Sequence, residues 1–259
     1  MARSPEICAL VDAHWSTFAS TLPPQTRVLD LGCGGGAVAR ALHAAEPWLQ
    51  VTGIDVAEVP PSNEPGFELL SNLPMESLPF ADGSFGAAVS QFGYEYGDQS
   101  SVAAEMARVL APRAPFSLLI HHPEGPIVDD MRRHRRAIEG LCGLHVQSAF
   151  FSGRANDLAE RLALLRRDCP HPVLDQAELG LQAHIRQNES DRLQVWRAVA
   201  EALAPELVML DSLDLCRADA KGIGHIMLPL MREFEVAQPA VLLTRAGEPI
   251  AWAIRGTRR

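Results

Sequence analysis

The stretch from Val28 to Leu42, VLDLGCGGGAVARAL, constrains the fold of this chain more than any other stretch. Its apolar start, residues 28–31, leads directly into four glycines and then into an alanine-rich segment of helix-forming composition. A strand, a glycine loop and a helix in this order place bare backbone at a helix N-terminus, where small ligands bind. The stretch therefore predicts an α/β fold with a ligand site at the end of its first strand.

Short apolar runs alternate with helical composition through the first half of the chain. We expect strands at 27–31, 51–56, 67–71, 85–91 and 116–120, and helices at 37–45 and 100–110. Because strands covered on both faces are short and apolar, the alternation predicts a parallel sheet. The proline-rich segment 57–66 predicts a loop in place of a crossover helix, since proline lacks a backbone donor.

The second half has a different character. From 124 to about 235 extended runs nearly vanish, and segments such as 155–168 and 191–204 carry apolar residues at helical spacing. We expect one domain of residues 1–259 in which residues 124–235 form a mostly helical insertion that acts as a lid. The end of the chain, AVLLTRAGEPIAWAIRG, reads as two apolar runs joined by a turn, which predicts an antiparallel pair.

Composition excludes several classes of function. The formal net charge of -9 argues against nucleic acid as a partner, because phosphate binding depends on lysine and arginine. The five cysteines are scattered without CxxC spacing, so we expect neither a disulfide framework nor a metal site. No run reaches the roughly 20 apolar residues of a membrane span, and the start lacks a signal-peptide core. We therefore expect a cytoplasmic protein with no membrane partner.

The glycines fit two ligand-binding patterns. Gly32, Gly34 and Ala37 match the G-x-G-x-x-A form of the dinucleotide fingerprint. The pattern D-x-G-x-G-x-G is also met, through Asp30, Gly32, Gly34 and Gly36, and it resembles motif I of the class I S-adenosylmethionine-dependent methyltransferases. A carboxylate at the loop entrance is unfavourable beside a pyrophosphate and favourable beside an ammonium and a sulfonium. The charge of Asp30 thus favours the second pattern.

Three further segments resemble the same family. MESLPFADGSFGAAVSQFG (75–93) and EMARVLAPRAPFSLL (105–119) are similar to stretches around its fourth and fifth strands, and the terminal hairpin is similar to its sheet end. The similarity covers about residues 25–122 and 238–257. It implies a Rossmann-like, doubly wound, mostly parallel seven-stranded sheet that ends in an antiparallel strand.

The resemblance also implies a site for S-adenosylmethionine, with S-adenosylhomocysteine as product. Asp30 would help to hold the amino group, and Asp55 would accept hydrogen bonds from the ribose hydroxyls. Val56 and Met75 would flank the adenine, although Pro74 replaces a common acidic partner of the adenine amino group. The implied cofactor-binding set is Asp30, Gly32, Cys33, Gly34, Gly36, Asp55, Val56, Met75, Gln91 and Phe92.

The predicted reaction is in-line methyl transfer to a small-molecule acceptor. A sulfonium already activates its methyl group, so alignment and exclusion of water matter most. The candidates that would orient or deprotonate the acceptor are His121 and His122 after the fifth strand, and Tyr94, Glu95 and Tyr96 after the fourth, with His121, His122 and Tyr94 as the predicted catalytic residues. Two alternatives stay open: a non-catalytic S-adenosylmethionine-binding or regulatory protein on this fold, and an NAD-dependent oxidoreductase.

Some features outside this region also bear on the acceptor. Val11, Trp15 and Phe18 are spaced to share one face of an N-terminal helix, which would cover the cofactor or pack as core. The aromatic residues at 150–151 and 196 would shape the acceptor pocket. The basic run 132–136 would clamp an anionic substrate or form a solvated helix face.

Overall fold

The computed structural model describes residues 4–59, 64, 66–216 and 222–259. The chain divides into two compact units. The sheet unit comprises the chain up to Ile127 together with Cys216–Arg259, and the helical unit comprises Val128–Leu215. The helical unit is thus shorter than the segment 124–235 expected from the sequence.

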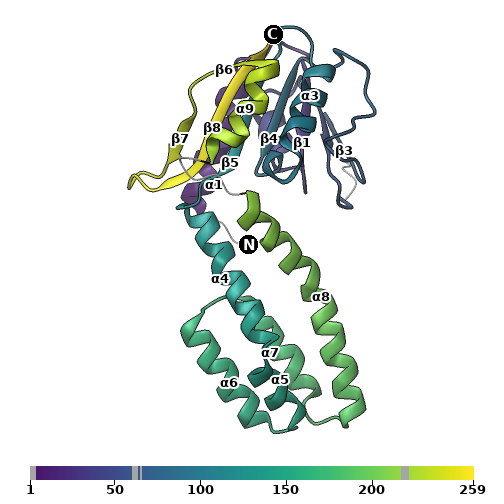
Figure 1. The fold of residues 1–259 in the computed structure, drawn as a ribbon, viewed down its shortest axis with the longest axis vertical. Helices are drawn as coiled ribbons and strands as arrows, with labels where there is room; N and C mark the ends of the chain where they lie inside the picture. Colours follow the sequence, from purple (N-terminus) through teal and green to yellow (C-terminus); the bar gives the residue numbers. More distant parts are fainter. Residues whose placement is uncertain (1–3, 60–63, 65, 217–221) are drawn as a thin grey trace. The chain divides into compact units, whose positions relative to one another are not determined.

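The sheet unit is built on one mixed sheet (Figure 1). Its strands are β1 (Arg27–Leu31), β2 (Gln50–Ile54), β3 (Phe67–Leu70), β4 (Ala87–Gln91), β5 (Pro115–His121), β6 (Phe234–Val236), β7 (Ala240–Leu243) and β8 (Pro249–Arg258). The order is β3-β2-β1-β4-β5-β8-β6. The first five strands are parallel, and β8 runs antiparallel to β5. The predicted doubly wound, mostly parallel sheet with an antiparallel end is confirmed.

The sheet has one strand more than the seven predicted. Both β6 and β7 pair with β8, along different parts of its length, with Val236 opposite Gly256 and Ala240 opposite Ala253. Pro239 lies in the short break between them, and proline cannot supply the backbone donor that a continuous ladder needs. The seventh position of the sheet is therefore filled by two short strands, and β6, three residues long, is too short to recognise by periodicity.

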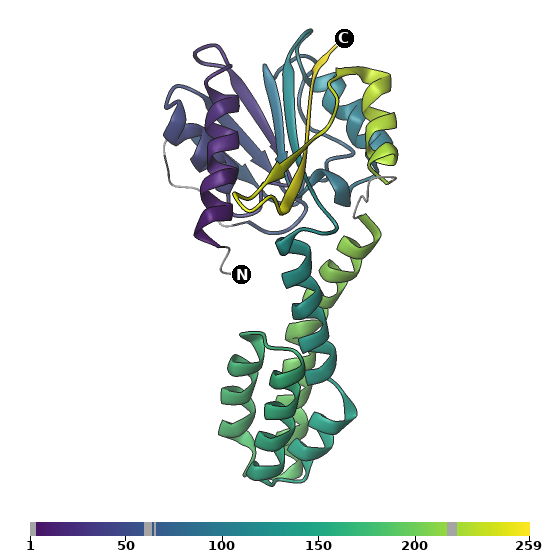
Figure 2. The same ribbon diagram turned by 90° about the vertical axis from the view of Figure 1, so that its left-hand side faces the viewer.

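Helices cover both faces of the sheet (Figure 2). They are α1 (Pro5–Ala19), α2 (Ala37–Ala45), α3 (Gln99–Val109) and α9 (Ile223–Glu233), with a short 3-10 helix, η1 (Tyr94–Tyr96). The pair α1 and α2 packs together on one face, and the pair α3 and α9 packs together on the other. The proline-rich loop was predicted for 57–66; its described residues 57–59 are not helical, while 60–63 and 65 lie outside the described residues.

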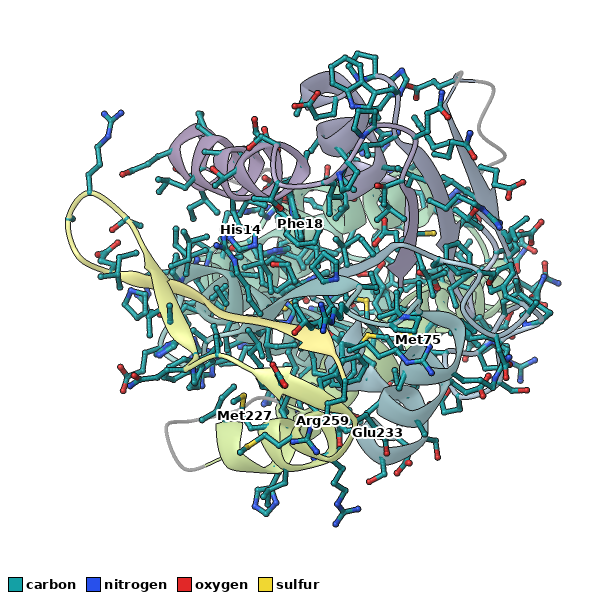
Figure 3. The ribbon with its side chains drawn as sticks, turned by 90° about the horizontal axis from the view of Figure 1, so that it is seen from above. His14, Phe18, Met75, Met227, Glu233 and Arg259 are labelled. Carbon is teal, nitrogen blue, oxygen red and sulfur yellow. The ribbon has the colours of Figure 1, made fainter. Side chains whose placement is uncertain are left out.

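The helix α1 is fixed to the sheet by apolar and polar contacts. It begins six residues before Val11, the first residue of the predicted apolar face, with Pro5 in its first turn, where proline is tolerated. Trp15 and Phe18 are buried as predicted. The ring of His14 accepts a hydrogen bond from Arg255 (3.3 Å) and donates to Ser117 Oγ (3.0 Å). Burial, and then the charge of Arg255, lowers the pKa of His14 to about 4, so this ring stays neutral. Figure 3 shows His14 and Phe18 on the side of α1 that faces the sheet.

The helix α9 belongs to the sheet unit although the sequence placed it in the insertion. Its buried residues Ile223, Ile226 and Leu230 join the same apolar core as α3 and the strands. Phe234, which follows α9 directly, is fully buried, and its ring lies against Phe116 with centroids 4.9 Å apart. The apolar face of α9 thus packs against the core of the sheet unit.

The helical unit contains five helices that share a separate core. They are α4 (Pro126–Leu141), α5 (Leu144–Phe151), α6 (Ala155–Asp168), α7 (Val173–His184) and α8 (Glu189–Cys216). Phe150 and Trp196 stack in this core with ring centroids 6.0 Å apart. In the basic run, Arg132 pairs with Asp129 and Arg133 with Asp130, which supports the interpretation of this run as a helix face rather than an anion clamp.

Candidate cofactor and acceptor site

The glycine loop after β1 has the bare backbone that the sequence predicts. Gly32, Gly34 and Gly36 all have positive φ angles, of 67°, 47° and 77°, which glycine adopts without steric cost. A Cβ on Gly32 would lie 2.9 Å from Gly93 Cα, so this glycine is required by packing. A Cβ on Gly34 would meet no described heavy atom within 4 Å. Packing therefore explains Gly32, whereas the open space beside Gly34 leaves room for a ligand.

Asp30, on β1 directly before the loop, is the most unusual carboxylate of this region. Its side chain is fully buried, and neither carboxylate oxygen has a hydrogen-bond partner among the described residues. Burial, and after it the nearby charge of Asp55, raises the pKa of Asp30 to about 7. Because an unpartnered buried carboxylate is costly, this position favours a positively charged group nearby.

Asp55 follows β2 and is tied to the same loop. Its Oδ2 accepts a hydrogen bond from the Gly34 N–H (2.9 Å), and its Oδ1 accepts one from the Ala57 N–H (2.9 Å). Each carboxylate oxygen keeps a second lone pair, so Asp55 can still accept from ligand hydroxyls. The Cys33 thiol lies between the two acids, and burial, Asp30 and Asp55 raise its pKa to about 12. Cys33 is therefore an inert thiol that lines the loop.

The predicted adenine residues lie in different surroundings. Val56 is 71% exposed and free to contact a ligand. Met75 is half-buried against the sheet core, and a Cβ on Gly97 would lie 3.2 Å from its Cε, so this side chain serves packing (Figure 3). The Leu73 N–H donates to the Asp55 carbonyl (2.9 Å), which fixes the start of the loop that carries Met75.

Gln91 and Phe92 lie at the end of β4, beside the glycine loop. Gln91 Oε1 accepts a short hydrogen bond of 2.6 Å from Trp15 Nε1, which ties α1 to this edge. Phe92 has a φ of 58°, a left-handed conformation that is costly for a residue with a side chain. Its N–H donates to the Leu119 carbonyl (2.8 Å), so the neighbouring strand holds it there.

The fold separates the three predicted catalytic residues, His121, His122 and Tyr94. The His121 ring is buried between Phe92 and Glu95, while the His122 ring lies against Trp252, with centroids 5.0 Å apart. Burial lowers the pKa of His122. Tyr94 is fully buried, its hydroxyl donates to the Gln99 carbonyl (3.1 Å), and burial raises its pKa. The structure therefore does not bring Tyr94 to the site, and it places the two histidine rings in different environments.

One pairing was missed by the sequence interpretation. Glu95 Oε1 accepts hydrogen bonds from the His121 backbone N–H (3.0 Å) and from its Nδ1 (2.8 Å), and Glu95 is fully buried. The strand pairing brings Glu95 and His121 near each other. Gln91 of β4 lies opposite Leu119 of β5, and Glu95 and His121 follow these residues by four and two positions. What the register could not supply is the turn of η1, which returns the Glu95 side chain towards β5.

No helix in the described part of the chain has the length and apolarity needed to cross a membrane. Nor does any group of three or more histidine, cysteine, aspartate or glutamate side chains come together there as metal ligands.

Comparison with known proteins identifies the domain. Residues 29–118 match the family model for a methyltransferase domain. The ubiquinone/menaquinone biosynthesis C-methyltransferase UbiE of Geotalea daltonii is 34% identical over 116 residues, which cover 39% of this chain and 49% of that protein. A glycine/sarcosine/dimethylglycine N-methyltransferase of Actinopolyspora halophila is 34% identical over 128 residues, covering 42% of this chain and 22% of that protein. The chain thus spans about half or less of the length of these relatives.

A solved structure is also similar to the whole chain. It is a SAM-dependent methyltransferase of Thermotoga maritima, a possible histamine N-methyltransferase, with 14% identity, a TM-score of 0.47, and coverage of 98% of this chain and 91% of that chain. The strand order is that of an α/β domain with a glycine loop after its first strand, and the stretch that matches the methyltransferase model lies within this domain. Residues 29–118 therefore match a methyltransferase domain, in agreement with the family that the sequence resembles.

Proposed function

We propose that this chain binds S-adenosylmethionine over the glycine loop and transfers its methyl group to a small-molecule acceptor. The observation that carries the proposal is the buried Asp30 carboxylate, whose two oxygens have no partner beneath a loop with open space at Gly34. A ligand ammonium would supply the positive charge that this carboxylate lacks. A pyrophosphate would add negative charge beside Asp30 and Asp55, which disfavours a dinucleotide.

The residues present fit the cofactor at several points. Asp55 would accept from the ribose hydroxyls while it keeps its hydrogen bond to Gly34, and the exposed Val56 would cover one face of the adenine. Gln91 and Phe92 would border the methionyl end. When bound, S-adenosylmethionine supplies an electrophilic methyl group, so the chain itself needs to align the acceptor and exclude water. We propose no role in the chemistry for Tyr94.

The small size of the acceptor is supported by the names of two relatives. One is a C-methyltransferase of quinone biosynthesis, and the other an N-methyltransferase of glycine and its methylated forms. The lid role of residues 124–235 and a cytoplasmic location stay predictions.

Calorimetry with S-adenosylhomocysteine and with NADH tests the proposal. We expect binding of the first and none of the second. Asp55→Ala should weaken binding at least 10-fold, because one charged acceptor of two hydroxyls is lost, while Asp12→Ala on the exposed face of α1 should leave it unchanged. Binding heat with NADH and none with S-adenosylhomocysteine would overturn the proposal. Binding without turnover over a broad acceptor panel would favour a non-catalytic protein instead.

A further inference from the structure

A second buried carboxylate lies at the ends of β4 and β5. Glu95 is fully buried, and its Oε1 receives both the backbone N–H and the Nδ1 of His121. Its Oε2 is buried as well and has no hydrogen-bond partner in the part of the chain that the structure describes. Since leaving a buried carboxylate oxygen without a donor is costly, core packing alone does not account for this residue.

The pairing determines the protonation pattern of the neutral imidazole. Because Nδ1 lies 2.8 Å from a carboxylate oxygen, the ring proton belongs on Nδ1, and Nε2 carries the lone pair. Among the described residues, Nε2 of His121 has no hydrogen-bond partner. A carboxylate on Nδ1 also stabilises the imidazolium that forms when Nε2 takes up a proton. The pair thus has the arrangement of a histidine base with a positioning carboxylate.

The pair lies beside the proposed cofactor site. The Phe92 ring stacks on the His121 ring, with centroids 4.2 Å apart and planes 26° apart. Phe92 is followed by Gly93, which closely approaches Gly32 of the glycine loop. The Tyr96 ring is nearly perpendicular to the His121 ring, with centroids 6.5 Å apart and planes 87° apart. Aromatic rings therefore surround the histidine at the edge of the sheet where the methyl group would be presented.

We propose that Glu95 positions His121 as a general base for an acceptor hydroxyl carried on a planar aromatic ring. This inference rests on the proposed function. The acceptor O–H gives its proton to His121 Nε2, and an oxygen lone pair forms the bond to the methyl carbon. The carbon–sulfur bond breaks and its electron pair stays on sulfur. Glu95 pairs with the imidazolium, which returns the proton to solvent after product release.

The need for a base defines the acceptor class. A phenol resembles the tyrosine side chain, with a pKa of about 10, and is protonated at neutral pH. It gains from proton removal during the transfer, whereas an acceptor that is already ionised does not. The aromatic neighbours Phe92 and Tyr96 favour a planar ring, because aromatic groups stack face to face with an offset or edge to face.

The first test needs no ligand. In nitrogen-15 spectra of the full chain, we expect His121 to be the Nδ1–H tautomer, assigned by the loss of its signals in His121→Gln. An Nε2–H tautomer would overturn the proposal, because the lone pair would then face Glu95.

The second test uses phenol and 4-nitrophenol as acceptors, the latter being largely ionised near neutral pH. Both His121→Gln and Glu95→Gln should lower phenol methylation about 100-fold, a typical contribution of general base catalysis, and 4-nitrophenol methylation less than about 10-fold. The exposed His225→Gln on α9 should change neither rate. Equal losses with both acceptors, or no methylation of either by a wild type that binds S-adenosylhomocysteine, would overturn the inference.

Controls separate this inference from the function on which it rests. Calorimetry with S-adenosylhomocysteine reports cofactor binding in every variant, and circular dichroism reports folding. A wild type that binds no S-adenosylhomocysteine would remove the proposed function itself. Should Glu95→Gln fail to fold, His121→Gln and the tautomer measurement decide the question without it.

Discussion

The two units of this chain treat charged groups in opposite ways. In the helical unit, side chains such as Arg133 and Arg166 form ion pairs that stay partly exposed, and the core holds aliphatic and aromatic residues. The sheet unit buries Asp30 and Glu95 completely, and three of their four carboxylate oxygens have no hydrogen-bond partner among the residues that the structure describes. Both acids lie near the carboxyl ends of parallel strands, where ligands of open α/β sheets bind. Buried carboxylates without a partner therefore mark the candidate site, whereas the unpartnered buried atoms of the helical unit, among its described side chains, are nitrogens of His134, His184 and Arg192.

The largest expected effect is on the core of the helical unit. Phe150→Ala should cost roughly 3–5 kcal/mol of its free energy of unfolding, because Phe150 is fully buried and stacks on Trp196. Thermal denaturation measures this loss, and the affinity for S-adenosylhomocysteine should not change. Leu144→Ala in the same unit is the control, since Leu144 is 76% exposed and should change stability by less than about 0.5 kcal/mol. A large loss of affinity for S-adenosylhomocysteine in Phe150→Ala would contradict the view that the core of the helical unit serves stability and not cofactor binding.

Asp30→Asn tests the opposite property in the sheet unit. The pKa of Asp30 is raised from 3.8 to about 7, so the folded state binds this proton more tightly than the unfolded state does. Stability is therefore lost as pH rises from about 4 to about 7, and the cost is complete at pH 8, at most about 4 kcal/mol. The unliganded variant should be more stable than the wild type at pH 8 and similar at pH 4, by denaturant unfolding.

The same variant should bind S-adenosylhomocysteine at least 10-fold more weakly, because its amide cannot neutralise the ligand ammonium. Asp12→Asn, on the exposed face of α1, is the matched control and should change neither stability nor affinity. A variant that is less stable than the wild type at pH 8 would mean that Asp30 has an internal partner.

The pH dependence of S-adenosylhomocysteine binding tests whether the buried Asp30 of the sheet unit serves the ligand. If a ligand cation requires ionised Asp30, wild-type affinity for S-adenosylhomocysteine should be constant above pH 7 and fall up to about 10-fold per pH unit below it. Calorimetry at pH 6 in two buffers of different ionisation enthalpy should also detect release of about one proton. In Asp30→Asn this dependence should disappear. A persisting slope would assign it to another group.

The sheet unit could be predicted from the sequence because its signals are local. The strand at Arg27–Leu31 and the helix at Ala37–Ala45 have the predicted bounds, since glycines and an abrupt change of composition delimit them. Asp30 and Asp55 could be predicted as site residues for the same reason, because Asp30 lies one residue before the end of a buried strand and Asp55 follows another. The sequence predicted the position of Asp30 at the loop but not its complete burial without a described partner, because that depends on all the elements packed around it.

Other parts depend on contacts between distant residues. The assignment of α9 to the sheet unit follows from Phe234 packing on Phe116, more than 100 positions away, which periodicity cannot reveal. The burial of Tyr94 and the pairing of Glu95 with His121 depend on how η1 turns after β4. The aromatic residues Phe150 and Trp196 look like pocket residues in sequence, and packing makes them core.

The smallest expected effect compares two glycines that both have open space for a methyl group. Gly34→Ala should lose about 1 kcal/mol of stability because its φ of 47° is unfavourable for alanine, and it should also weaken S-adenosylhomocysteine binding. Gly180→Ala, at an exposed position within α7, should gain about 0.5–1 kcal/mol and leave binding unchanged, because alanine favours the helix. Thermal denaturation and calorimetry on the pair measure both quantities. If Gly34→Ala bound as tightly as the wild type, the open space beside the loop would have no ligand to receive, and the site would have to lie elsewhere.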